Sequence, residues 1–142
     1  MTNNGKTTVI QFVKYALVGV INTLVTLIVI YVTKSFLGIK PMGANAIGYG
    51  CGLINSFIWN KTWVFRSQKD FKREAVKFMA GFGLCYALQF VIVWVLTYRT
   101  PLGAMQWEIQ GMAFSGYAIA TLAGNVGYTA ANFIYNRTVT FK

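Results

Sequence analysis

Two similar nine-residue stretches carry the side chains best suited to bind a ligand. The stretches 57–65 (FIWNKTWVF) and 133–141 (FIYNRTVTF) are identical at five of nine positions. In each, an asparagine precedes a basic residue, Asn60–Lys61 in the first and Asn136–Arg137 in the second. Guanidinium and ammonium groups bind phosphate oxygens, and a neighbouring amide can hydrogen-bond a hydroxyl group. This pattern suits an anionic headgroup such as that of a lipid.

Most catalytic chemistry is excluded by residues that the chain lacks. It has no histidine, so Ser-His and Cys-His dyads and histidine-based metal sites are impossible. Its three acidic residues, Asp70, Glu74 and Glu108, leave little for paired-carboxylate catalysis. Cys51 and Cys85 lie in apolar stretches and are expected to be buried free thiols. We therefore expect a protein that is not an enzyme and holds no metal or cofactor.

The composition predicts an integral membrane protein. Of the 142 residues, 56% are hydrophobic and only 11% are charged, less than half of the roughly 25% that is usual in soluble domains. Pro41 and Pro101 fall between long apolar stretches, where helices should break. A membrane-spanning helix needs about 20 apolar residues. The sequence thus predicts four transmembrane helices, over 9–33, 42–64, 76–98 and 111–137.

The basic residues predict the orientation of these helices. Ten lie on one side of the four predicted spans and three on the other. Cytoplasmic loops are enriched in Lys and Arg, so both termini and the middle loop are expected in the cytoplasm. The middle loop, Arg66–Lys77, also mixes basic and aromatic residues, but it is too short to predict nucleic-acid binding. Orientation alone explains most of the net charge of +10.

The repeated motif predicts an internal duplication. At the same offset Gly48 corresponds to Gly124, and Gln11-Phe12 more weakly resembles Lys77-Phe78. The chain is thus expected to be all-α, one domain over 1–142, built from hairpin repeats over about 9–65 and 76–141. Because each hairpin crosses twice, the repeats are parallel. Transporters often bind substrate between repeats, although duplication can also simply produce a stable bundle.

Polar side chains within the predicted spans are candidate ligand contacts. Five asparagines could either join helices through hydrogen bonds or bind a ligand. Three basic residues lie about one turn inside the cytoplasmic boundary, where they could extend to the headgroups or hold a phosphate. The candidates are Asn22, Asn55, Asn60, Asn132 and Asn136 for polar contacts, and Lys14, Lys61 and Arg137 for phosphate. Rows of small residues around Gly48 and Gly124 suit close helix packing.

These features resemble the GtrA-like family of small membrane proteins. The resemblance rests on Phe12–Thr23 and on the two span ends, 55–65 and 132–141, and covers about residues 10–142. It implies four helices in the cytoplasmic membrane and the transfer of polyprenyl-phosphate-linked sugars across it, for O-antigen, teichoic acid or similar polymers. The implied headgroup role extends to Lys14, Asn22, Asn60, Lys61, Asn132, Asn136 and Arg137. Ser56 stands where the second repeat has Asn132, so the resemblance does not decide between Asn55 and Asn60.

Two functional hypotheses follow. The first is a translocase for a lipid-linked sugar, such as a sugar on undecaprenyl phosphate. The second is a non-transporting membrane partner of a polyprenyl-phosphate glycosyltransferase. A proton-coupled exporter is disfavoured, because no Asp or Glu lies within a predicted span. Small-residue rows also favour self-association, and a homodimer is expected.

Overall fold

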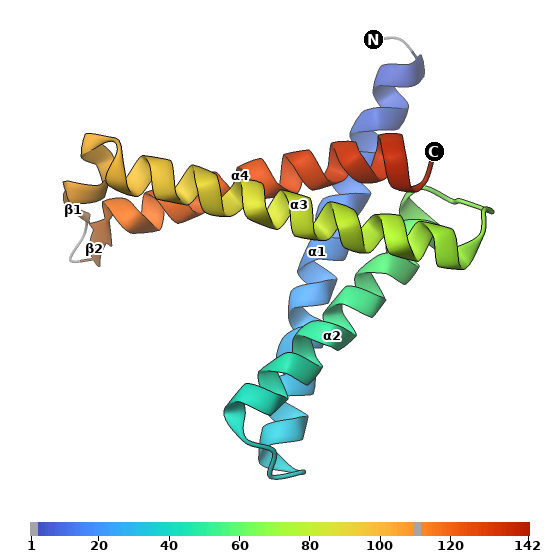
Figure 1. Ribbon diagram of the computed structural model, residues 1–142, viewed down its shortest axis with the longest axis horizontal. Coiled ribbons are helices and arrows are strands. Elements are labelled where there is room, and N and C mark those ends of the chain that lie inside the picture. Colours follow the sequence, from blue (N-terminus) through green and yellow to red (C-terminus); the bar gives the residue numbers. More distant parts are fainter. Residues whose placement is uncertain (1–2, 110–111) are drawn as a thin grey trace. The chain divides into compact units, whose positions relative to one another are not determined.

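The computed structural model describes residues 3–109 and 112–142 (Figure 1). Most of these residues lie in four long helices: α1 (Asn3–Ser35), α2 (Pro41–Trp59), α3 (Phe71–Tyr98) and α4 (Gly116–Tyr135). A five-residue π-helix follows α2 (η1, Asn60–Val64), and another follows α4 (η3, Asn136–Thr140). Between α3 and α4 lie a 3-10 helix (η2, Pro101–Ala104) and two antiparallel strands, β1 (Gln106–Ile109) and β2 (Met112–Ser115).

The prediction of a fourth helix over 111–137 is wrong at its start. Residue 111 lies outside the described residues, 112–115 form β2, and α4 begins at Gly116. The side chain of Ser115 accepts a hydrogen bond from the backbone nitrogen of Ala118 at 3.2 Å. This cap satisfies a backbone donor of the first helical turn. The residues before the cap are uncharged, and their hydropathy does not distinguish a β-strand from an apolar helix.

Two other helices begin earlier than expected, α1 at Asn3 and α3 at Phe71. At α3 the reason is again a cap, because the carboxylate of Asp70 accepts a hydrogen bond from the backbone nitrogen of Arg73 at 2.8 Å. The acidic Glu74 in the first turn also stabilises the helix, because a negative charge interacts favourably with the positive end of the helix dipole. These charged residues lengthen α3 beyond the apolar segment used to predict it.

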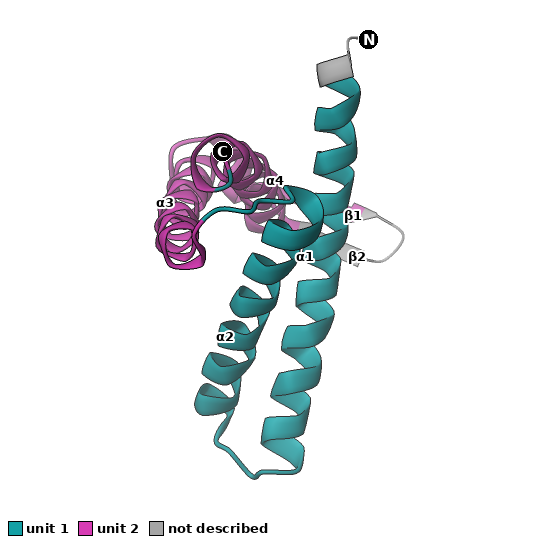
Figure 2. Ribbon diagram, turned by 90° about the vertical axis from the view of Figure 1, so that its right-hand side faces the viewer, with its two compact units in different colours: residues 1–69, 141 teal, residues 70–140, 142 magenta. Residues whose placement is uncertain are grey.

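The described chain divides into two compact units, coloured separately in Figure 2. Unit 1 holds the residues up to Lys69 together with Phe141, and unit 2 holds Asp70–Thr140 together with Lys142. In unit 1, α1 packs along α2. In unit 2, α3 packs along α4. Each unit is therefore built on a helical hairpin.

Glycines allow the two helices of unit 1 to approach closely. A Cβ atom placed on Gly48 would lie 3.0 Å from the backbone oxygen of Thr26 and would also clash with Ile30. A Cβ atom on Gly52 would clash with the hydroxyl group of Thr26. Close approach of this kind is what small residues provide at helix interfaces in membranes. The row of small residues in α2 therefore faces α1.

Unit 2 uses glycines of α4 in the same way. A Cβ atom on Gly124 would lie 2.6 Å from Cγ2 of Val93, and one on Gly127 would lie 2.8 Å from Cδ1 of Ile92. Both contacts are shorter than real Cβ atoms make. At Gly127 the end of the Ile92 side chain could move aside, whereas Gly124 also lies close to the backbone oxygen of Gln89, so a larger residue there would press against α3. The correspondence of Gly48 with Gly124 thus reflects a shared packing role.

The aromatic ring of Phe141 packs in unit 1. Its centroid lies 5.1 Å from that of Phe65, with the rings 17° from parallel, and 5.9 Å from that of Phe57. Phe65 and Phe141 occupy equivalent positions in the two motif stretches. The last aromatic residue of the second stretch therefore stabilises the first.

Among the residues that the structure describes, two helices are long and apolar enough to cross a membrane, Gly5–Ser35 and Phe71–Tyr98. Only 11% of the most apolar window of each is buried within the fold. A core helix of a soluble protein would be mostly buried, whereas here large apolar side chains such as Leu27 and Phe90 are more than half exposed. This distribution suits helices whose outer faces contact lipid.

Candidate functional site

The two π-helices begin at the repeated asparagines. In η1 the backbone nitrogen of Phe65 donates to the oxygen of Asn60 at 2.9 Å, a bond that spans five residues. The segment η3 starts at Asn136, the equivalent position of the second repeat. Short π segments inside α-helices are rare and occur frequently at functional sites. Both repeats therefore place this unusual backbone at the motif that the sequence singled out.

Asn60 presents a buried carbonyl oxygen. The residue is 1% exposed, and its Nδ2 donates to the backbone oxygen of Ser56 at 2.8 Å and to Ser56 Oγ at 3.2 Å. A backbone carbonyl can only accept, so this contact fixes which end of the amide faces Ser56. The opposite atom, Oδ1, is buried and has no hydrogen-bond partner among the described residues.

Asn136 repeats this arrangement in unit 2. The residue is 0% exposed, and its Nδ2 donates to Asn132 Oδ1 at 3.2 Å, while Asn132 Nδ2 donates to the hydroxyl oxygen of Tyr128 at 3.3 Å. Oδ1 of Asn136 is buried and unpartnered within the described part of the chain. Buried polar atoms usually have a partner. An oxygen of this kind suits a ligand that brings an O–H or N–H donor.

Unit 1 brings two of the predicted phosphate contacts to one end of its hairpin. The ammonium group of Lys14, from α1, lies 5.1 Å from the ring centroid of Trp63 in η1. Lys61 lies two residues before Trp63, and its Nζ donates to the backbone oxygen of Lys69 at 2.7 Å. Cation–π contact with an indole ring holds an ammonium group in place. Lys14 is therefore positioned beside η1 rather than simply extended towards solvent.

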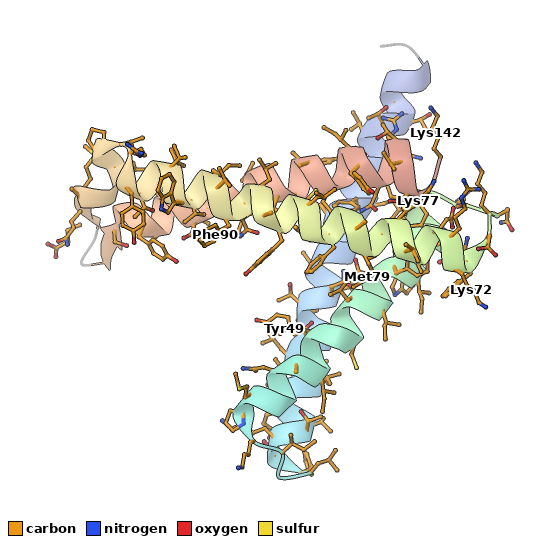
Figure 3. All side chains as sticks on the ribbon, viewed as in Figure 1. Tyr49, Lys72, Lys77, Met79, Phe90 and Lys142 are labelled. Carbon is orange, nitrogen blue, oxygen red and sulfur yellow. The ribbon has the colours of Figure 1, made fainter. Side chains whose placement is uncertain are left out.

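Unit 2 has an equivalent basic pair that sequence reasoning recognised only in part. Arg137 is half-buried within η3. Lys77, from α3, donates to the backbone oxygen of Val139 in the same π-helix at 3.0 Å. From the sequence Lys77 belongs to the basic middle loop, and only its weak correspondence with Gln11 marks the position. Figure 3 shows Lys77 at the end of α3 opposite the β-strands.

Two predicted polar contacts instead join the helices of unit 1. Asn55 Nδ2 donates to Asn22 Oδ1 at 2.6 Å. In unit 2, Gln89 Nε2 donates to Asn125 Oδ1, also at 2.6 Å, although neither residue was a predicted contact. Asn55 lies five residues before η1, whereas Asn125 lies eleven before η3. Each hairpin therefore ends in a π-helix, but the hydrogen bond that joins its two helices lies at a different distance from that π-helix in each hairpin.

The structure thus arranges the candidates within each unit as follows. In unit 1, Lys14, Asn60 and Lys61 gather at the end that carries η1, whereas Asn22 and Asn55 bond each other farther along the hairpin. In unit 2, Asn132, Asn136 and Arg137 lie along the end of α4 and in η3. Each unit therefore combines a buried carbonyl acceptor with nearby cations.

A comparison with curated proteins gave no match. The model of the GtrA/DPMS transmembrane domain family matches residues 14–141, which is nearly the whole chain and includes both π-helices. The family is associated with the handling of polyprenyl-phosphate-linked sugars. The match confirms the resemblance drawn from the opening segment and the two span ends. The chain belongs to the GtrA/DPMS transmembrane domain family.

Proposed function

We propose that this protein translocates polyprenyl-phosphate-linked sugars across the cytoplasmic membrane. The observation that supports this most is the repeated π-helix, in which a buried carbonyl oxygen, on Asn60 or Asn136, adjoins a basic residue. A phosphate offers only acceptors at neutral pH, whereas sugar hydroxyl groups donate. The cations can bind the phosphate, and the carbonyl acceptors can bind the sugar hydroxyl groups. Together they fit a headgroup that contains a phosphate and a sugar, whereas either group of residues alone would fit only half of it.

In this proposal the phosphate binds Lys14, Lys61 and Arg137, and sugar hydroxyl groups donate to the asparagine carbonyls. Arg offers a planar fork for phosphate oxygens and Lys a compact charge. The prenyl chain stays in lipid while the headgroup crosses. No reaction step is required, so the protein acts as a passive route and not as an enzyme.

The proposal includes four membrane spans with both termini in the cytoplasm. The helices α2 and α4 contain 19 and 20 residues, which at 1.5 Å per residue gives about 30 Å, the thickness of the hydrocarbon core. Among the described helices only α1 and α3 are apolar enough over 18 residues to count as spans by composition. The helices α2 and α4 contain glycines and asparagines, several of which face the partner helix of the hairpin. The excess of basic residues on one side supports the orientation.

We further propose that the protein functions as a homodimer beside a membrane glycosyltransferase. That enzyme class consumes the translocated lipid-linked sugar to glycosylate a cell-surface polymer such as teichoic acid. Exposed apolar faces on α1 and α3 provide surfaces for such contacts in the membrane.

The test uses proteoliposomes that contain undecaprenyl phosphate linked to glucose, galactose or N-acetylglucosamine. The accessibility of the sugar from outside is followed for the wild type, Lys61→Ala and Arg137→Ala. The matched control is Lys34→Ala, which removes an exposed lysine from the last turn of α1. The proposal expects rapid exchange in the wild type and the control, with loss in the other two variants.

Other outcomes would change the conclusion. If exchange persists in both variants, transport stands but Lys61 and Arg137 serve only to orient the chain. If no lipid exchanges faster than in empty liposomes, translocation is refuted. The alternative, a non-transporting partner of a glycosyltransferase, would then be tested by co-purification of that enzyme.

A further inference from the structure

Unit 2 contains a hollow between α3 and α4, at some distance from the π-helix. Its volume is about 450 Å³, within the range of about 300–1,000 Å³ typical of small-molecule sites. None of the residues that line it is charged. They are Tyr86, Gln89, Phe90, Val93, Trp94, Thr97, Tyr98, Tyr117 and Thr121. We call this space the aromatic hollow.

Four aromatic rings of α3 follow one another at intervals of four residues, namely Tyr86, Phe90, Trp94 and Tyr98. Such spacing places them along one face of the helix; Figure 3 shows Phe90 on the outside of α3. The correspondence of Gln11-Phe12 with Lys77-Phe78 aligns these rings with aliphatic residues of α1, namely Val20, Leu24, Ile28 and Val32. The hairpin of unit 1 therefore forms with aliphatic residues at the positions that carry the four aromatic rings in unit 2.

The wall also carries an unpartnered hydroxyl group. Thr97 Oγ1 is buried and has no hydrogen-bond partner among the residues that the structure describes. By contrast, Gln89 is bonded to Asn125, and the hydroxyl group of Thr121 donates to the backbone oxygen of Tyr117 at 2.8 Å. A hydroxyl group can both donate and accept. Thr97 therefore lines the hollow and carries a hydroxyl group without a hydrogen-bond partner among the described residues.

We propose that the aromatic hollow binds the sugar of the lipid-linked substrate after it has crossed the membrane, an inference that rests on the proposed function. A pyranose has apolar C–H faces, which pack on aromatic rings, and a rim of hydroxyl groups, which needs partners such as Thr97. An uncharged wall suits the sugar and not the phosphate. The guanidinium group of Arg99 lies 5.6 Å from the centroid of Trp94 and provides a cation for the attached phosphate.

The aromatic hollow is a second site, separate from the proposed phosphate site at the π-helix η3. Lys77 contacts η3, and Trp94 lies 17 residues farther along the same helix, which corresponds to about 25 Å. Phosphate and sugar are directly linked in one headgroup, so one substrate cannot occupy both places at once. Because the hydrocarbon core is about 30 Å thick, the two sites would serve opposite leaflets.

The test is ¹⁹F NMR of the full chain, labelled with 5-fluorotryptophan, in nanodiscs. Four tryptophans give four resonances, each assigned by a single Trp→Phe variant. Trp94 reports on the hollow, and Trp63, beside Lys14, reports on the proposed phosphate site. The probes are citronellyl phosphate and its glucosyl, galactosyl and N-acetylglucosaminyl esters.

The proposal expects the Trp94 resonance to shift at lower concentrations of at least one sugar ester than of citronellyl phosphate, which can bind Arg99 but has no sugar for the hollow. Thr97→Val should weaken that binding between about twofold and tenfold, the value of one neutral hydrogen bond. Tyr31→Leu, which removes an exposed ring from α1, should leave it unchanged. A Trp94 shift at equal concentrations of citronellyl phosphate and of every ester would show that the sugar adds nothing to binding and would refute the proposal, as would no shift with any ester. Trp63 tests the phosphate site separately, so failure of one site is distinguishable from failure of the other.

Discussion

The hydrogen bond between Asn22 and Asn55 allows a quantitative test of whether these residues join helices or bind substrate. The bond is 2.6 Å long and partly buried, between side chains 33 residues apart in sequence. Interhelical hydrogen bonds in membrane proteins contribute about 0.6 kcal/mol on average and about 1.7 kcal/mol at most. Because this contact is short and shielded, we expect a value in the upper half of that range. A coupling of about 1.4 kcal/mol changes the folding equilibrium tenfold.

A double-mutant cycle measures this coupling. Asn22→Ala, Asn55→Ala and the double variant are unfolded in mixed micelles, and the free energies of unfolding are compared with that of the wild type. The expected result is a coupling of about 1.2–1.7 kcal/mol, and sugar exchange in proteoliposomes should be preserved in the folded double variant. Additive single effects, or loss of exchange in variants that remain fully folded, would refute the assignment to helix joining.

The bond between Gln89 and Asn125 provides a matched cycle in unit 2. It has the same length, but its side chains are exposed. In water an exposed bond would contribute little, because the separated groups would bind water. In hydrocarbon the separated groups lack that alternative. We expect the two couplings, both measured in mixed micelles, to agree within about 0.5 kcal/mol, and a Gln89–Asn125 coupling near zero would place that pair in water.

Three further predictions concern packing and the π-helices. Gly124→Ala should lower the free energy of unfolding by about 1–3 kcal/mol through overpacking, whereas Gly50→Ala, which meets open space, should not lower it; both are measured in the same micelle assay. Asn60→Leu should slow sugar exchange by about twofold to tenfold, because it removes the buried acceptor, and Ser56→Ala, which retains that acceptor, should slow it less. Phe141→Ala should cost about 3 kcal/mol of stability through the lost stacking in unit 1; an unchanged unfolding curve would contradict that contact.

The helices could be predicted because charge and proline divide the sequence clearly, but the π-helices could not. The choice between a bond that spans four residues and one that spans five depends on local backbone geometry, and the residues Asn60–Val64 would suit an α-helix equally well. The start of α4 was missed for a related reason. A polar cap, Ser115, decides it, within a stretch that hydropathy treats as continuous.

The candidate site was predictable in its residue types but not in its contacts. The repeat pointed to Asn60 and Asn136, and both proved to be buried with an unpartnered oxygen. The contact of Lys14 with Trp63 depends on the register of α1 against η1, and that of Lys77 with Val139 depends on the register of α3 against η3. The aromatic hollow could not be predicted, because only the pairing of α3 with α4 brings its lining residues together.

The paired π-helices also record something of the history of the chain. A π segment arises when one residue is inserted into an α-helix, which rotates all later side chains by about 100°. The two π segments begin at equivalent asparagines, Asn60 and Asn136. A single insertion before a duplication of the hairpin would account for both, whereas separate insertions would each have had to fall at the same position of the motif. What diverged afterwards was the rest of the hairpin, including the ladder of rings that only the second copy possesses.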